Sequence, residues 1–182
     1  MNRFGNEDSQ LGLDYYRRLG GGFWGYLSGD LSPEADFLPR YSLGGGVFRS
    51  YRRLESGVNL RYMRFRNSEV FLLAPSITLY LPKGAYHTAT LYLNVKRSTF
   101  SLLNRFGYKD RQKELFLSIS FGTSSERLQA GEDFVRYSTF SAGAGGELRL
   151  TDRFSLGASL KFEDRRGLYR RYGVSAYGRL WW

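Results

Sequence analysis

Charged residues alternate with apolar ones along several stretches of this chain, and these charges are the side chains best suited to chemistry. Glu147 and Arg149, for example, alternate with Leu148 and Leu150. Alternation with a period of two places such charges on one face of a strand. We expect that face to be enclosed. The predicted inward charges are Asp14, Arg18, Arg61, Lys96, Arg105, Glu147, Arg149, Lys161, Glu163 and Arg179.

Basic residues outnumber acidic ones in this inward set, which would suit a channel that prefers anions or guides a polyanion. The alternative is an ion-pair network that fills the interior. Barrels of about eight strands are filled by side chains and barrels of about sixteen leave a channel, so strand number bears on this choice.

A second basic group flanks the last predicted outer loop and consists of Arg165, Arg166, Arg170 and Arg171. Guanidinium forks match the geometry of phosphate and carboxylate groups. Phosphate groups or an anionic glycan could therefore dock here. A solvated loop is the alternative.

Catalysis, metal binding and cofactor binding find little support in the sequence. His87 is the single histidine and cysteine is absent, so thiolate sites are excluded and a metal site is unexpected. We expect no enzyme, no metal and no cofactor.

The net charge of +10 would also suit nucleic acid, but the basic residues alternate along strands and form no recognised motif. We expect no nucleic-acid partner.

The last eleven residues, 172–182, alternate without a break and end on Trp182. A chain that ends inside such a strand resembles bacterial outer-membrane β-barrels. That resemblance implies that the barrel-assembly machinery reads this strand during insertion. The expected insertion signal comprises Tyr172, Gly173, Leu180 and Trp182.

The whole chain is predicted to be all-β, an antiparallel up-and-down transmembrane β-barrel. No run approaches the ~20 apolar residues of a spanning helix, whereas a tilted strand needs only about 9–11 residues. Glycine (22 residues) and aromatic residues (17%) are abundant, as in lipid-facing barrels. Eleven strands are predicted, at 10–19, 22–31, 40–51, 55–66, 70–82, 86–97, 99–109, 113–124, 135–150, 154–164 and 170–182.

Bacterial single-chain barrels close with an even number of strands, so we expect twelve in the complete domain. Residues 1–182 are therefore predicted to form one barrel domain that lacks its first strand. The N-terminus has no apolar signal segment, which export would require. We expect the chain to be part of a longer exported protein with an upstream periplasmic region.

Short turns and longer links alternate between the predicted strands. Tight turns at 20–22, 83–85 and 151–153 are expected on the periplasmic side, and longer links at 32–40 and 125–135 on the outer side. Asn104 falls in the middle of a strand on the predicted lipid face. Apart from an error in the predicted register, the sequence offers no reason for a polar side chain at that position.

Residues 32–51 resemble the YaiO-type outer-membrane β-barrel domain, as do 57–65 and 70–81. Tyr86 and the strand end at 106–108 are also similar. Departures are the missing first strand and a short link at 96–98. The resemblance implies a porin-like barrel of the Gram-negative cell envelope and supplies no catalytic motif.

The resulting expectation is an outer-membrane pore or scaffold in envelope transport, with exopolysaccharide as the cargo that the resemblance implies. The expected partners are outer-membrane lipid, lipopolysaccharide, the barrel-assembly machinery and an anionic polysaccharide. Two alternatives remain: a structural or adhesive barrel with a plugged lumen, and a soluble lipocalin-like barrel that binds a ligand. The soluble barrel would bury its apolar positions and expose its polar ones.

Overall fold

The computed structural model describes residues 2–3, 6–7, 9–33, 35, 38–126 and 135–180. Regular structure in these residues consists of β-strands and one 3-10 turn, η1 (Pro82–Gly84). No helix among them has the length and apolarity needed to cross a bilayer.

The predicted strands are all present, with small differences at their ends. They are β3 (Leu11–Gly20), β4 (Phe23–Leu31), β5 (Tyr41–Tyr51), β6 (Leu54–Arg64), β7 (Glu69–Tyr80), β8 (Ala85–Asn94), β9 (Thr99–Lys109), β10 (Lys113–Glu126), β11 (Val135–Arg149), β12 (Phe154–Arg165) and β13 (Tyr169–Leu180). The sequence did not indicate the two-residue strands β1 (Asn2–Arg3) and β2 (Asn6–Glu7), which pair with each other.

Strands β3 to β13 form one antiparallel sheet in which neighbours in sequence are neighbours in space. The order is β13-β12-β11-β10-β9-β8-β7-β6-β5-β4-β3, so β3 and β13 are its edges and the sheet is not closed. This confirms the all-β, up-and-down fold class. A twelfth strand stays a prediction.

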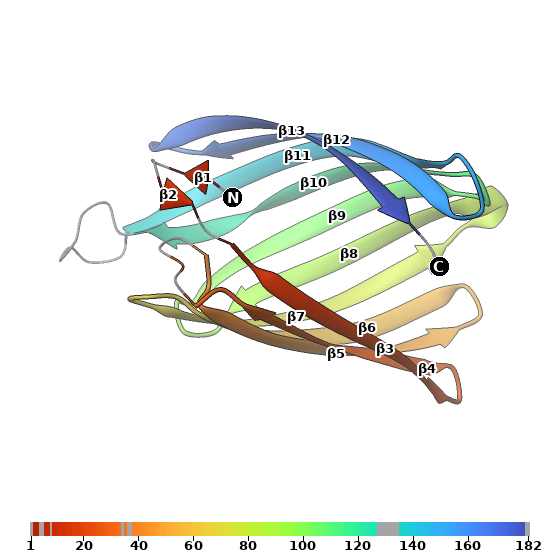
Figure 1. Cartoon of the computed structure of the whole chain (residues 1–182), viewed down its shortest axis with the longest axis horizontal. Coiled ribbons are helices and arrows are strands. Elements are labelled where there is room, and N and C mark those ends of the chain that lie inside the picture. Colours follow the sequence, from red (N-terminus) through yellow and green to blue (C-terminus); the bar gives the residue numbers. More distant parts are fainter. Residues whose placement is uncertain are drawn as a thin grey trace. The chain divides into compact units, whose positions relative to one another are not determined.

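The chain divides into two compact units. Unit 1 contains Met1–Ser76 and Tyr92–Ser98, and unit 2 contains Ile77–Leu91 and Thr99–Trp182. Figure 1 shows β3 to β6 side by side in unit 1 and β9 to β13 side by side in unit 2.

The connections differ between the two ends of the strands. One end, called the turn end here, carries the connections 21–22, 52–53, 81–84, 110–112 and 150–153. The opposite end, the loop end, carries 65–68, 95–98, 166–168 and the described residues of 32–40, and β10 ends and β11 begins there. Residues 127–134 of the predicted link 125–135 lie outside the described residues. The two-residue turn after β3 uses Gly20, Gly21 and Gly22 at φ of 88°, 60° and 79°, a conformation that glycine adopts without steric cost.

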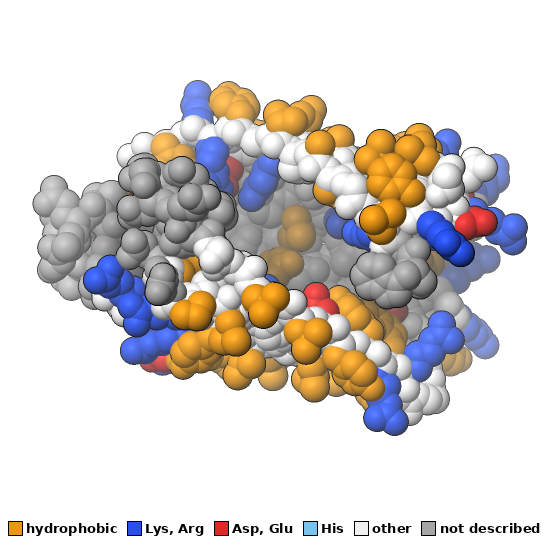
Figure 2. Space-filling view, viewed as in Figure 1, with side chains coloured by type: hydrophobic (Ala, Val, Ile, Leu, Met, Phe, Trp, Pro, Cys, Tyr) orange, Lys and Arg blue, Asp and Glu red, His pale blue; other side chains and the backbone are white. Residues whose placement is uncertain are grey.

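The sheet has one apolar and one polar face, and the apolar face is exposed. Leu13 and Leu27 are 77% and 66% exposed in unit 1, and Leu160 is 61% exposed in unit 2. By contrast, the polar-face residues Ser42 and Ser155 are each 1% exposed. Figure 2 shows hydrophobic side chains along the strands and many Lys and Arg side chains toward strand ends. This polarity is the reverse of a soluble lipocalin-like barrel.

Candidate functional site: the polar face of the sheet

In unit 1 the polar face is organised around Asp30 of β4. Arg61 Nη2 lies 2.6 Å from Asp30 Oδ2 and also donates to Ser42 Oγ at 3.1 Å. The Ser42 hydroxyl donates to the same Asp30 oxygen. Asp14 joins Asp30 and Arg61 in lining a cavity of about 430 Å³. Arg61 thus faces a carboxylate that the predicted set did not include.

Arg18 and Lys96, the other predicted inward charges of this unit, lie elsewhere. Arg18 is the cross-strand partner of Trp24 near the turn end of β3. Lys96 lies beyond the end of β8 and forms an ion pair with Glu69. Tyr62 Oη donates to Glu69 at 2.7 Å. Lys96 therefore binds at a strand end rather than at the middle of the polar face.

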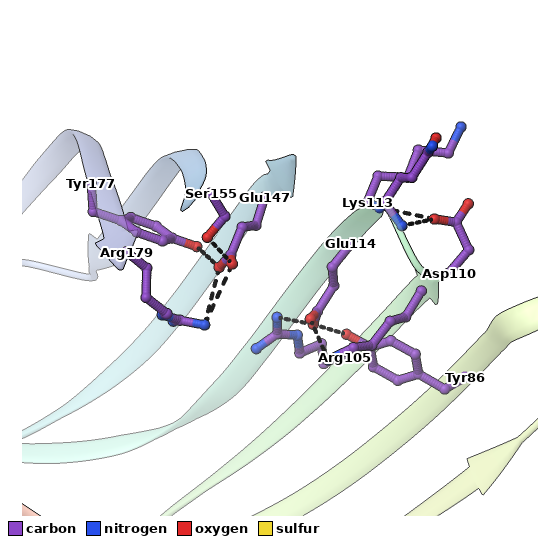
Figure 3. A network of polar contacts seen from close by, with 11 residues as sticks. Tyr86, Arg105, Asp110, Lys113, Glu114, Glu147, Ser155, Tyr177 and Arg179 are labelled. Carbon is purple, nitrogen blue, oxygen red and sulfur yellow. Dashed lines mark hydrogen bonds and ion pairs between the residues drawn. The ribbon is translucent and has the colours of Figure 1, made fainter. Parts of the chain in front are cut away.

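Near the turn end of unit 2, two carboxylates lie directly opposite each other, because Glu114 of β10 pairs in register with Glu147 of β11. Like charges in this arrangement repel unless each has its own partners. Glu114 accepts hydrogen bonds from Tyr86 Oη at 2.9 Å and Arg105 Nη2 at 3.2 Å (Figure 3). It also pairs with Lys109 at 3.1 Å. These cations neutralise the first carboxylate.

Glu147 has a separate set of partners. Ser155 Oγ donates at 2.7 Å, Tyr177 Oη at 3.2 Å, and Arg179 Nη1 lies 3.3 Å away (Figure 3). Arg149 lines a cavity of about 320 Å³ with Glu147 and Arg179. The predicted charges Arg105, Glu147, Arg149 and Arg179 are thus brought to one end of the polar face.

Near the loop end of unit 2, a single carboxylate binds several cations. The Glu163 side chain is 10% exposed and accepts from Arg165 Nε and Arg171 Nη2, each at 2.7 Å. Lys161 Nζ lies 3.6 Å from it. Because Glu163 is nearly enclosed, losing it would leave several positive charges close together without their shared partner.

The predicted outer basic group is split between the two faces of β12 and β13. Arg165 and Arg171 bind Glu163 on the polar face, whereas Arg170 pairs with Asp164 at 3.6 Å. Arg166 lies in the connection after β12. Three of the four arginines, Arg165, Arg170 and Arg171, therefore form ion pairs with carboxylates of the protein itself.

Aromatic rings on the polar face lie against glycines of the neighbouring strand. A Cβ atom built on Gly57 would overlap the Phe48 ring, and one on Gly107 would overlap Tyr86. Gly157 has the same relation to Tyr177. The missing side chain of each glycine makes room for the ring, and this close approach explains why glycine occupies these positions.

Between the two charged ends of unit 2, small residues dominate the polar face. From β10 to β13, and apart from Phe116 and Lys161, the two middle cross-strand rows consist of Gly145, Ser159, Ser175, Ser118, Gly143 and Gly173. On β9 these rows continue with Gly107 and Arg105. Ser159 and Ser175 bond through their hydroxyls at 2.7 Å. This part of the face is therefore hydroxyl-lined and offers little steric obstruction.

Asn104 has a partner on the apolar face. His87 Nε2–H donates to Asn104 Oδ1 at 3.1 Å, and the His87 ring stacks on Phe106 with centroids 4.4 Å apart. Asn104 pairs in register with Ile119, an apolar-face residue. The predicted register was therefore right, and the partner from β8 explains the polar side chain.

Asp110, in the connection after β9, structures a turn outside the strands. The backbone N–H groups of Gln112 and Lys113 donate to Asp110 Oδ1 at 2.7 and 2.8 Å, and Tyr108 Oη donates to Oδ2 at 2.9 Å. These hydrogen bonds favour the charged carboxylate and lower the pKa of Asp110 below its ordinary value.

The proposed insertion signal lies on the edge strand β13. Tyr172, Leu180 and Gly173 belong to this strand, with Tyr172 and Leu180 77% and 67% exposed. Trp182 lies outside the described residues. Across the described part of the chain, no group of three or more His, Cys, Asp or Glu residues is arranged to hold a metal ion.

An antiparallel sheet with an exposed apolar face and an ion-paired polar face is the arrangement found in membrane β-barrel proteins, and this chain is of that class. The family model of the YaiO membrane beta barrel domain matches residues 1–127. The chain belongs to this family. None of the curated proteins compared with it matches.

Proposed function

We propose that this domain spans the bacterial outer membrane and acts as a pore in envelope transport, with an exported polysaccharide as its cargo. The observation that carries the proposal is the polar face of unit 2. Its charges gather near both strand ends, at Glu114, Glu147 and Glu163. Serine and glycine dominate the rows between them. A face of this kind suits passage of a hydrated polymer.

The proposal includes partners. Outer-membrane lipid would cover the exposed apolar face, and the barrel-assembly machinery would read β13 during insertion. Arg166 and Arg170, near the loop end, would meet lipopolysaccharide phosphates. We assign no catalytic step and no nucleic-acid partner to the chain.

A structural or adhesive barrel with a plugged lumen is the second candidate. It is favoured by the multiple ion pairs of Glu163 and Glu114. Such pairs could close the interior as well as line it.

Planar-bilayer conductance separates the two candidates, after faster gel migration of unboiled protein has shown that the barrel is folded. A pore predicts steady single-channel currents that fall when Gly143→Trp narrows the small-residue region. The matched control, Ala142→Trp, changes the adjacent apolar-face position of β11 and should leave the current unchanged. Folded protein without conductance would support the plugged barrel.

A further inference from the structure

Unit 1 contains an aromatic platform near the turn end of its polar face. Arg18, Trp24, Phe48 and Gly57 lie opposite one another on successive strands β3 to β6. The Phe48 ring occupies the space above Gly57. Trp24 stacks on Phe48 with centroids 4.1 Å apart and planes 9° apart. The row therefore orients the indole parallel to a ring that is itself fixed against the sheet.

Hydrogen bonding fixes the same indole independently. Trp24 Nε1–H donates to Glu55 Oε2 at 2.9 Å, and Ser50 Oγ donates to the same oxygen at 2.7 Å. A stacked and hydrogen-bonded ring loses little conformational entropy when a ligand binds. Such preorganisation suits recognition better than a mobile aromatic side chain would.

Trp24 also lines a cavity of about 790 Å³. Tyr16, Ser50 and the turn glycines contribute to its wall, and its charged lining residues are Arg17 and Arg18. The site thus combines an aromatic surface, a hydroxyl group and guanidinium groups. A pyranose presents an apolar C–H face and a rim of hydroxyls, and a hexuronate adds one carboxylate that suits an arginine fork.

We propose that this cavity binds a hexuronate residue of an acidic polysaccharide, with the sugar ring stacked on Trp24 and its carboxylate paired with Arg18. The inference deepens the proposed function, on which it rests for the cargo class. It assigns the recognition of charge to Arg18 and of ring shape to Trp24.

Calorimetric titration of the full-length protein, extracted from membranes in lauryldimethylamine oxide, tests the proposal. This detergent has no sugar head group to compete for the site. Hexa-galacturonate is the probe and maltohexaose is the neutral control. We expect binding of the galacturonate alone, weakening as salt rises. Equal binding of both oligosaccharides, or binding of neither by folded protein, would overturn the assignment.

Substitutions separate stacking from charge. Trp24→Leu should weaken galacturonate binding about tenfold or more, the scale of stacking contributions, and Arg18→Gln should weaken it by a similar factor. Trp24→Phe retains an aromatic face and should give an intermediate affinity. Phe121→Leu, which changes an exposed ring on the apolar face of unit 2, is the matched control and should leave affinity unchanged. Each variant is compared after its folded gel mobility is verified.

Two further outcomes are informative. In the first, inorganic phosphate displaces the oligosaccharide at equal concentration while Trp24→Leu leaves the affinity for the oligosaccharide unchanged. That result would make the cavity a general anion site and overturn the proposal. Conductance bears on the proposed pore alone. Binding without conductance would refute the pore and leave the platform supported, whereas conductance without binding would refute the platform.

Discussion

The packing of Tyr86 against Gly107 makes the sharpest stability prediction. A methyl group at position 107 would overlap the Tyr86 ring, whose hydroxyl donates to Glu114 at 2.9 Å. Gly107→Ala should therefore displace the ring and weaken this hydrogen bond. Overpacking costs about 1–3 kcal/mol, and the weakened hydrogen bond adds about 1 kcal/mol. We expect a total loss of about 2–4 kcal/mol.

The same substitution should behave differently when the ring is absent. In a Tyr86→Ala background, position 107 has room for a methyl group. Replacing glycine by alanine then reduces the entropy of the unfolded chain and changes stability by about 0 to 1 kcal/mol in the stabilising direction. The double-mutant cycle should consequently give a coupling energy of at least about 2 kcal/mol.

Urea unfolding of the protein in lipid vesicles measures these differences through the transition midpoint. Gly29→Ala is the control, because a methyl group there meets only Leu43 and Ser42 atoms at ordinary distances of 3.8 and 3.9 Å. It should leave the midpoint nearly unchanged. If Gly107→Ala is equally destabilising with and without the Tyr86 ring, the packing argument is wrong.

Three further predictions concern other parts of the chain. The backbone amides of Gln112 and Lys113, which bind Asp110, should stay protected from hydrogen exchange above about pH 4, the ordinary aspartate range. They should lose protection as the pH falls through the lowered pKa of Asp110, because the protonated carboxyl is a weaker acceptor, and Asp110→Asn should abolish this pH dependence. Asn104→Leu or His87→Leu alone should destabilise by about 1 kcal/mol by leaving a partner unpaired, and the double variant should recover that loss in urea titrations. Glu163→Gln should lower stability by about 1–3 kcal/mol, less at high salt; no loss in the same titration would show that its ion pairs are not stabilising.

The strands were predictable because alternation between two solvents is a local property of the sequence. Residues 154–164 were predicted as a strand and β12 covers Phe154–Arg165. The predicted strand 86–97 extends past β8, which ends at Asn94. Side chains no longer alternate between two faces where a turn begins. The ends of the strands were therefore predicted less accurately than the number of strands in the sheet.

Side-chain partners were not predictable, because they depend on register between strands. Glu114 becomes the partner of Arg105 and Tyr86 only once β8, β9 and β10 are paired. Asn104 likewise finds His87 on another strand. The position of a polar residue in an alternating strand predicts the face on which its side chain lies. It does not predict the residue with which that side chain forms a hydrogen bond or ion pair.

Labelling of single cysteines along β12 tests the central claim most directly, namely that the exposed apolar face meets lipid and the polar face is enclosed. The chain contains no cysteine, so each introduced thiol gives one unambiguous site. In native outer membranes, spin labels at Leu156→Cys, Ala158→Cys and Leu160→Cys should be accessible to oxygen in lipid. Labels at Ser159→Cys and Lys161→Cys, on the polar face of the same strand, should instead be accessible to a water-soluble nickel chelate or shielded from both reagents. The opposite alternation, or recovery of the protein in the soluble fraction, would contradict the account.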